Sequence, residues 1–435
     1  MTKQHRIITL IAIVGMLSLN SCSSKLSPTT QKATTSNSES ALKKPYVLLI
    51  SLDGFRWDYV DKYRPPNLIN FISKGVKAQS LIPSYPSKTF PNHYTIATGM
   101  YPDKHGIIGN IFYSYEKEAT YNIRNREMAE DGSFYGGSPI WIEANKASMV
   151  TASYFFVGTE ANIQGMSPTY YYKYDGSVKN ETRVAQAVKW LKMPAKKRPH
   201  LVTMYFSDMD DAGHNFSPSN DEELKNKLLA LDKNLGDLFK GIAATGLPVN
   251  IIIVSDHGMA NQSIENLIPV DDIQNDSLFS TINNGSIVNI HPKDHIDTND
   301  LLEDLKRKEH HFKVYKTEDT PGFENIPTNK DWGPLQLVPD LGYYFSTKKS
   351  IAARIEKNIT TIGVHGFDTK YKDMHGIFYA KGPAFKKNYE IPAVKNIHIY
   401  PLMCRLLGLE IPEGIDGDLD QIKSVLTPLL NKEQD

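Results

Sequence analysis

The sequence predicts an α/β fold, in which a doubly wound and mostly parallel sheet is flanked by helices and carries a smaller capping insertion. Continuous apolar segments of strand length occur at Tyr46–Leu52, His200–Ser207 and Val249–Ser255. Such uninterrupted runs are typical of strands that are buried on both faces. Amphipathic segments of helical length lie between them, and this alternation indicates parallel strands joined by helical crossovers.

The chain begins with the pattern of an export signal. Lys3 and Arg6 precede an apolar run, Ile7–Leu19, which is shorter than an ordinary membrane-spanning helix. The next residues complete the sequence Leu-Asn-Ser-Cys, which is similar to a bacterial lipobox, with Cys22 as the lipidated residue. A plain signal peptide with an incidental cysteine is the alternative. We expect residues 1–22 to form a signal peptide with a lipobox and Cys22 to become the lipidated N-terminus of the mature chain. The exported protein would then be lipid-anchored to the bacterial cell envelope, on its periplasmic or outer-surface face.

The segment 23–44 is expected to be a flexible tether, because its first part is rich in Ser, Thr, Lys and Gln. A folded domain is expected to follow at 45–430. The only other cysteine, Cys404, lies in a mostly apolar stretch, which favours a small core residue. If Cys22 carries lipid, the mature chain contains no disulfide.

Two helices are expected between the three strands, at Glu181–Leu191 and Asp221–Ala244. The second has a single leucine stripe, formed by Leu224, Leu228, Leu231, Leu235 and Leu238. The segment 262–360 is less regular. We expect it to contain extra strands and the capping insertion.

Acidic residues follow each of the three apolar segments, and histidines accompany them after the second and third. They are Asp53 after the first, Asp210 and His214 after the second, and Asp256 and His257 after the third. A single Asp in such a place is usually a helix cap or a turn residue. However, the carboxyl ends of parallel strands open on one crevice, so three such segments deliver their side chains to one place. Asp210 and His214 are four residues apart and would share one side of a helix.

Carboxylates together with imidazoles are the ligand set of zinc and similar divalent ions. Two such ions about 4 Å apart can stabilise the attacking and the leaving oxygen of a displacement at phosphorus. A nucleophile is then needed between them, and the segment 83–110 is rich in hydroxyl side chains.

This segment contains KTFPNHYTIATGMYPDKHGIIGN, which resembles the nucleophile region of the nucleotide pyrophosphatase/phosphodiesterase family of the alkaline phosphatase superfamily. The segments SLDGFRWDY, GGSPIWIEA, DMDDAGH, SDHGM and GVHGFD resemble further parts of that family, in the same order. The resemblance extends from about residue 45 to 426. It implies an alkaline-phosphatase-like catalytic domain.

The resemblance also implies the roles of individual residues. Thr89 would be the nucleophile and would contact the first metal, and Asn110 would donate its amide to a phosphoryl oxygen. The first metal would be held by Asp53, Asp256 and His257, and the second by Asp210, His214 and His365. The two ions are expected to be Zn²⁺. The position after Asp368 is usually Asn in the family and is Thr369 here, which touches no ligand.

Other histidines are alternatives at this site. His375 is a rival to His365 for the sixth ligand position, and the family motif favours His365. His93 and His105 lie in the nucleophile segment but match no ligand position, which favours structural hydrogen bonds.

Two aromatic residues are expected to bind a nucleobase. Phe90 follows the nucleophile and resembles one wall of the family's base pocket, and Tyr171 resembles the opposite wall. The run of tyrosines at 170–174 leaves the register open by one residue. Closing the core is the alternative role for both rings.

The expected activity is therefore that of a two-metal hydrolase that cleaves phosphodiester or pyrophosphate bonds of nucleotides through a covalent threonine intermediate. Its substrate would be a small molecule, and a nucleoside 5′-monophosphate would be released. Basic and acidic residues both number 49, so no nucleic-acid-binding surface is expected, and contact with the membrane is expected only through the N-terminal lipid.

Three other functions stay open. The first is a choline-type phosphodiesterase. The second is a phosphomonoesterase or phosphonate hydrolase of the same superfamily, which the absence of a basic pair after the nucleophile segment disfavours. The third is a surface-binding lipoprotein on a degenerate enzyme fold, which the complete set of ligands disfavours. A sulfatase is disfavoured because the nucleophile position is threonine.

Overall fold

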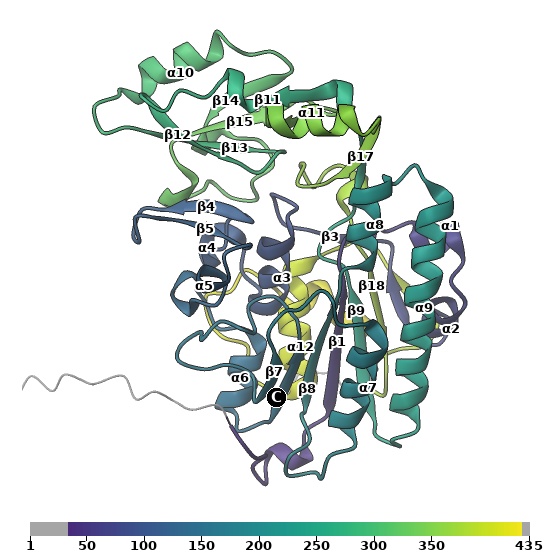
Figure 1. The fold of residues 1–435 in the computed structure, drawn as a ribbon. Helices are drawn as coiled ribbons and strands as arrows, with labels where there is room; N and C mark the ends of the chain where they lie inside the picture. The colour runs from purple at the N-terminus through teal and green to yellow at the C-terminus, as the bar shows by residue number, and fades with distance from the viewer. Residues whose placement is uncertain (1–33, 429–435) are drawn as a thin grey trace, which may run out of the picture.

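The computed structural model describes residues 34–428 and has a large sheet with helices on both faces (Figure 1). The strand order is β19 (Tyr389–Ile391), β2 (Val76–Ala78), β18 (Phe378–Lys381), β9 (Val249–Val254), β1 (Tyr46–Leu52), β8 (Leu201–Phe206), β6 (Thr151–Tyr154) and β7 (Tyr170–Tyr172). All neighbours are parallel except where β18 pairs with β9 and β2. The predicted fold class is confirmed.

The sheet separates two hydrophobic cores, which explains why its central strands are apolar throughout. In β1, Val47 and Leu49 belong to one core, whereas Leu48 and Ile50 belong to the other. The first core includes side chains of α3 (Thr89–Thr98), α6 (Ile140–Lys146) and α12 (Ile399–Leu407). The second includes those of α2 (Pro66–Ile72), α7 (Asn180–Leu191) and α9 (Asp221–Ala243), where the predicted leucine stripe is fully buried.

A smaller antiparallel sheet lies above the large one (Figure 1). Its order is β12 (Phe279–Asn283), β13 (Val288–Pro292), β15 (Leu335–Pro339) and β14 (Phe312–Lys316), and α10 (Thr298–Lys306) packs on it to form a separate core. This sheet falls within the segment 262–360. The chain enters and leaves the region through β10 (Ala260–Ser263) and β17 (Thr361–Val364), which pair with each other.

The predicted tether, 23–44, is corrected over its second half, because residues 34–44 lie against the domain. Asn37 is only 2% exposed. Its amide nitrogen donates hydrogen bonds to the carbonyls of Ala195 (2.8 Å) and Arg198 (2.7 Å), and its oxygen accepts one from the Val150 amide (2.7 Å). One asparagine therefore satisfies three backbone groups, which a polar composition does not reveal.

The signal peptide, Cys22 and residues 23–33 lie outside the described residues. Within residues 34–428, no helix is both long and apolar enough to cross a membrane.

Candidate active site

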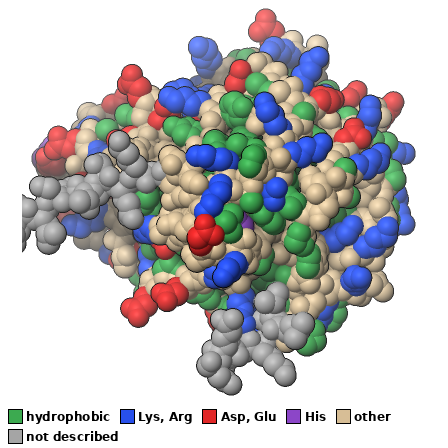
Figure 2. All heavy atoms as spheres, turned by 90° about the horizontal axis from the view of Figure 1, so that it is seen from below, with side chains coloured by type: hydrophobic (Ala, Val, Ile, Leu, Met, Phe, Trp, Pro, Cys, Tyr) green, Lys and Arg blue, Asp and Glu red, His purple; other side chains and the backbone are tan. Residues whose placement is uncertain are grey.

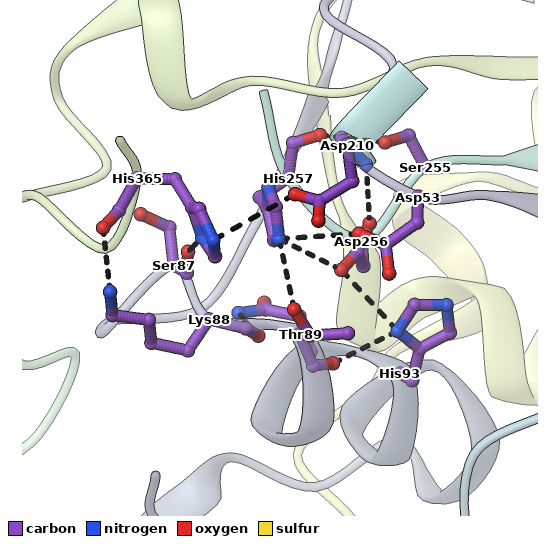
Figure 3. Close-up of polar contacts among 12 residues, drawn as sticks. Asp53, Ser87, Lys88, Thr89, His93, Asp210, Ser255, Asp256, His257 and His365 are labelled. Carbon is purple, nitrogen blue, oxygen red and sulfur yellow. Dashed lines mark hydrogen bonds and ion pairs between the residues drawn. The ribbon is translucent and has the colours of Figure 1, made fainter. Parts of the chain in front are cut away.

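Five segments meet at the carboxyl edge of the large sheet (Figure 3). Asp53 directly follows β1, Asp256 and His257 follow β9, and α8 (Asp208–Phe216) follows β8 and carries Asp210 and His214. Thr89 is the first residue of α3, and His365 comes immediately after β17. The expectation that the strand ends share one crevice is therefore met by the geometry.

The six predicted metal ligands form two adjoining groups. In the first, His257 Nε2 lies 3.4 Å from Asp53 Oδ1 and 3.1 Å from Asp256 Oδ2. The Thr89 hydroxyl is 3.3 Å from the same nitrogen.

In the second group, Asp210 Oδ1 lies 3.4 Å from His214 Nε2 and 3.8 Å from His365 Nε2. The rings of His257 and His365 stack at 3.6 Å between centroids, so the two groups share a border.

The three histidines of these groups share one orientation. Each donates its Nδ1 hydrogen to a backbone carbonyl: His214 to Gly363 (2.8 Å), His257 to Gly258 (2.7 Å) and His365 to Ser87 (2.8 Å). A carbonyl can only accept, so the hydrogen is on Nδ1 and the lone pair is on Nε2. Each Nε2 faces a carboxylate, and this is the outer-shell arrangement that orients metal-binding imidazoles.

The carboxylates of the site are buried, and one oxygen of each has no hydrogen-bond donor among the described residues. Oδ1 of Asp53, Oδ1 of Asp210 and Oδ2 of Asp256 accept no hydrogen bond from the described residues. Burial raises the pKa of Asp256 to about 8, and burial together with the nearby carboxylates raises the pKa of Asp53 well above its ordinary value. A bound divalent cation would compensate this charge, and the oxygen and nitrogen donors present fit zinc.

His93 lies against the first group but is poorly placed to be a ligand. The ligand atoms of Asp53, His93 and Asp256 are all within 4.8 Å of one another. However, His93 Nδ1 is 2.9 Å from the Thr89 carbonyl and 3.3 Å from Asp256 Oδ2, so this nitrogen carries the hydrogen. Its Nε2 is 2.8 Å from the Ser51 hydroxyl. His93 therefore hydrogen-bonds to the backbone carbonyl of Thr89, and its ring lies beside the Asp256 carboxylate.

His375, the rival to His365, has both ring nitrogens occupied elsewhere. Nε2 is 2.8 Å from the Thr369 carbonyl, and Nδ1 is 2.9 Å from the Ser80 hydroxyl. His105 is likewise enclosed, since Nε2 meets the Thr95 hydroxyl at 3.0 Å and Nδ1 accepts from the Ile107 amide at 3.2 Å.

A cavity of about 560 Å³ opens from Thr89 and the two ligand groups, and Phe90 and Asn110 line it. The Asn110 oxygen accepts a hydrogen bond from the Phe90 amide (3.0 Å). This bond fixes the side-chain amide of Asn110, whose NH₂ group then remains as a donor.

The aromatic wall predicted at Tyr171 is corrected to Tyr174. Tyr171 is paired with Ser153 within the sheet, is 38% exposed and does not line the cavity. Tyr174 lies two residues beyond the end of β7, lines the cavity and contacts the ring of Tyr205 at 6.0 Å between centroids. This part of the cavity wall therefore comes from residues that follow the end of β7. The alternation of side chains along a strand cannot predict which of those residues faces the cavity.

Sequence reasoning missed several residues of the site. Tyr205 donates a hydrogen bond to Asp53 Oδ2 (2.5 Å) from within an apolar strand. Lys88, which is buried, donates to the His365 carbonyl (2.8 Å) and to the Tyr344 hydroxyl (2.9 Å). Lys88 thus links the segment before α3 to the residue that follows β17 and to β16 (Tyr344–Ser346). In the sequence, only its position before Thr89 pointed to a role in the site.

Two missed ion-pairing residues, Arg126 and Glu160, line the cavity beyond Phe90. They contact each other, and Arg126 also pairs with Glu130. Their positions in the sequence do not predict that they lie together, because no motif or regular spacing connects the two residues.

Comparison with known proteins gives a consistent result. The family model "Type I phosphodiesterase / nucleotide pyrophosphatase" matches residues 47–368. Mouse ectonucleotide pyrophosphatase/phosphodiesterase family member 1 is 32% identical over 412 residues, which cover 90% of this chain and 44% of that protein. Human family member 5 is 32% identical over 366 residues, which cover 83% of this chain and 74% of that protein. The chain thus spans less than half the length of some curated relatives.

Solved structures agree. Murine ectonucleotide pyrophosphatase/phosphodiesterase 5 superposes with a TM-score of 0.81 at 30% identity, covering 88% of this chain and all of that chain. The same protein has been solved as an inactive variant, with one threonine replaced by alanine, in complex with AMP, and it matches with the same TM-score at 29% identity. The chain belongs to the type I phosphodiesterase/nucleotide pyrophosphatase family.

Proposed function

We propose that this protein hydrolyses phosphodiester and pyrophosphate bonds of nucleotides through a covalent intermediate on Thr89, with two divalent metal ions, and releases a nucleoside 5′-monophosphate. One observation carries the proposal. The Thr89 hydroxyl lies beside two adjoining groups of carboxylates and of histidines whose Nε2 atoms carry the lone pair, and Thr89 lines a cavity that also has aromatic side chains in its wall.

The unpartnered oxygens and the oriented histidines fit the two metals that the family resemblance implies. Asp53, Asp256 and His257 would hold one ion, and Asp210, His214 and His365 the other. When bound, such ions lower the pKa of a coordinated hydroxyl and stabilise negative charge on phosphoryl oxygens.

The residues of this chain would carry out two displacements. Thr89 Oγ attacks phosphorus, and its bond to phosphorus forms as the bond to the leaving oxygen breaks. Water then attacks the phosphothreonine diester, which restores the Thr89 hydroxyl and releases the monophosphate. Throughout, the Asn110 amide donates to a non-bridging oxygen, and His93 and Lys88 keep the start of α3 in place.

Nucleotides are favoured over other diesters by the cavity walls. Phe90 and Tyr174 both line the cavity, and aromatic rings stack on any nucleobase. The AMP complex of the murine relative supports the same choice, and the inactivity of its threonine-to-alanine variant supports a threonine nucleophile. We also propose that the protein is exported and lipid-anchored through Cys22, from the pattern of its first residues.

A substrate panel tests the proposal. The purified chain with Zn²⁺ should hydrolyse p-nitrophenyl thymidine 5′-monophosphate much faster than p-nitrophenyl phosphate, and should convert ATP to AMP and pyrophosphate. A chelator should abolish both reactions, and Zn²⁺ should restore them. Preferential hydrolysis of the monoester, or of glycerophosphocholine, would replace the proposal with one of the two alternative enzymes.

A further inference from the structure

A basic surface lies at the end of the molecule opposite the candidate active site. Parallel strands have their amino ends at one edge, and the register places the starts of β1, β8, β6 and β9 side by side. The antiparallel strand β18 ends at the same edge. We call this edge the basic pole, and it is made by the segments 43–45, 189–200, 240–248 and 381–388, with residues 74 and 146.

Exposed lysines crowd this pole. They are Lys43, Lys74, Lys146, Lys189, Lys192, Lys196, Lys197, Lys240 and Lys387. Figure 2, which views the molecule from below, shows blue side chains across most of this face and red ones mainly toward its rim. Because the whole chain carries equal numbers of basic and acidic residues, this excess reflects an uneven distribution of charge and not a basic protein.

Few of these charges are neutralised. Lys146, Lys196 and Lys240 pair with Glu143, Glu39 and Asp237. Over the part of the chain that the structure describes, the remaining lysines of the pole have no carboxylate within 4 Å. A surface of unpaired ammonium groups attracts an anionic partner.

Residues 34–37, the first that the structure describes, lie at this same pole. The Thr34 hydroxyl donates a hydrogen bond to the Asn145 carbonyl (2.9 Å), and Asn37 is bonded to the loop before β8. Cys22 is twelve residues before Thr34. A chain spans at most about 3.5 Å per residue, so a lipid on Cys22 would hold the pole within roughly 40 Å of a bilayer.

We propose that the basic pole docks on an anionic phospholipid surface and turns the catalytic cavity away from the membrane. Lipid anchoring is strengthened when an acyl chain is combined with a polybasic patch, because each lysine near an anionic surface adds to the affinity. Asp53, which lines the cavity, directly follows the end of β1, at the edge of the sheet opposite the basic pole. A docked molecule therefore keeps its site open to soluble substrates. The proposal does not depend on the reaction that the site catalyses.

The test uses the chain from Ser23 onward, which contains every described residue and lacks the lipid. It should sediment with vesicles of phosphatidylcholine and phosphatidylglycerol at a 7:3 ratio, and hardly with phosphatidylcholine alone. Binding should weaken as NaCl rises from 50 to 300 mM, since salt screens the attraction. Reversing three charges, Lys43→Glu, Lys192→Glu and Lys387→Glu, should lower vesicle affinity at least ~10-fold.

A matched control reverses three exposed lysines outside the pole, Lys225→Glu, Lys349→Glu and Lys357→Glu, and should bind vesicles like the unmodified chain. Both triple variants should retain turnover of a soluble nucleotide ester, which shows that they fold. Equal binding to both vesicle types, or equal loss in the two triple variants, would overturn the proposal. So would binding to a double-stranded oligonucleotide without binding to the anionic vesicles.

Discussion

The metal arrangement makes opposite predictions for His365 and His375. The Nε2 of His365 points at Asp210 with its lone pair, whereas both nitrogens of His375 are hydrogen-bonded to Ser80 and Thr369. His365→Ala should therefore reduce bound zinc from two ions per chain to about one. His375→Ala should keep both ions and lose only its hydrogen bonds.

The zinc-dependent part of the lost stability distinguishes the two variants. A site saturated at 100 times its dissociation constant stabilises the folded state by about 2.7 kcal/mol, so His365→Ala should lose roughly this stabilisation in the presence of zinc. It should also lose the hydrogen bond to the Ser87 carbonyl, and that cost does not depend on zinc. His375→Ala leaves a buried hydroxyl and a carbonyl unpaired, which costs about 1–3 kcal/mol with or without zinc.

Metal analysis of the purified variants, together with urea unfolding with and without a chelator, measures both effects. Wild-type protein and His105→Ala serve as references, since His105 is buried away from the site. Loss of one zinc in His375→Ala with both retained in His365→Ala would refute the ligand assignment.

Three other predictions concern the cavity, the nucleophile's support and pH. Phe90→Ala and Tyr174→Ala should each lower kcat/KM for a thymidine ester more than for bis(p-nitrophenyl) phosphate, by a transition-state free energy of about 1–3 kcal/mol, and Tyr171→Ala should not. Equal effects on both substrates would contradict base stacking on these rings. His93→Ala should lower both the zinc affinity, measured by chelator competition, and kcat by about 10–100-fold, because it removes the hydrogen bond to the Thr89 carbonyl and the ring beside Asp256. His93→Asn should recover part of the loss through its amide, and unchanged values in His93→Ala would show that His93 supports neither residue. Burial raises the pKa of Glu324 to about 7 in the folded protein, from an ordinary value of 4.5. As the pH rises from about 4.5 to 7, the carboxyl group therefore loses its proton in the unfolded chain but keeps it in the folded chain, so the folded state of the wild type becomes less stable. Glu324→Gln should lessen that loss by on the order of 1–3 kcal/mol in unfolding experiments, and identical pH profiles would contradict it.

The elements that local pattern specifies were predictable. The strand predicted at 46–52 has the same bounds as β1, because its two-sided burial requires an apolar residue at every position. Asp53 and Asp256 were predictable as neighbours for a related reason, since parallel strands that start together also end together.

The features of the site that the sequence does not predict depend on contacts between distant segments. The carbonyls that orient His214 and His365 belong to Gly363 and Ser87, each more than a hundred residues away. Tyr174 replaces Tyr171 because β7 ends before it, and strand ends are not marked in a run of tyrosines. Asn37 binds three backbone groups of loops that the chain reaches only much later.

The stereochemical course at phosphorus tests the central claim most directly. A nucleotide ester with a chiral phosphorothioate centre would be hydrolysed in ¹⁸O-labelled water, and the configuration of the product would be determined by ³¹P NMR. Two in-line displacements, first by Thr89 and then by water, invert the centre twice and predict net retention. Net inversion would mean that water attacks phosphorus directly, and would contradict a covalent intermediate on Thr89.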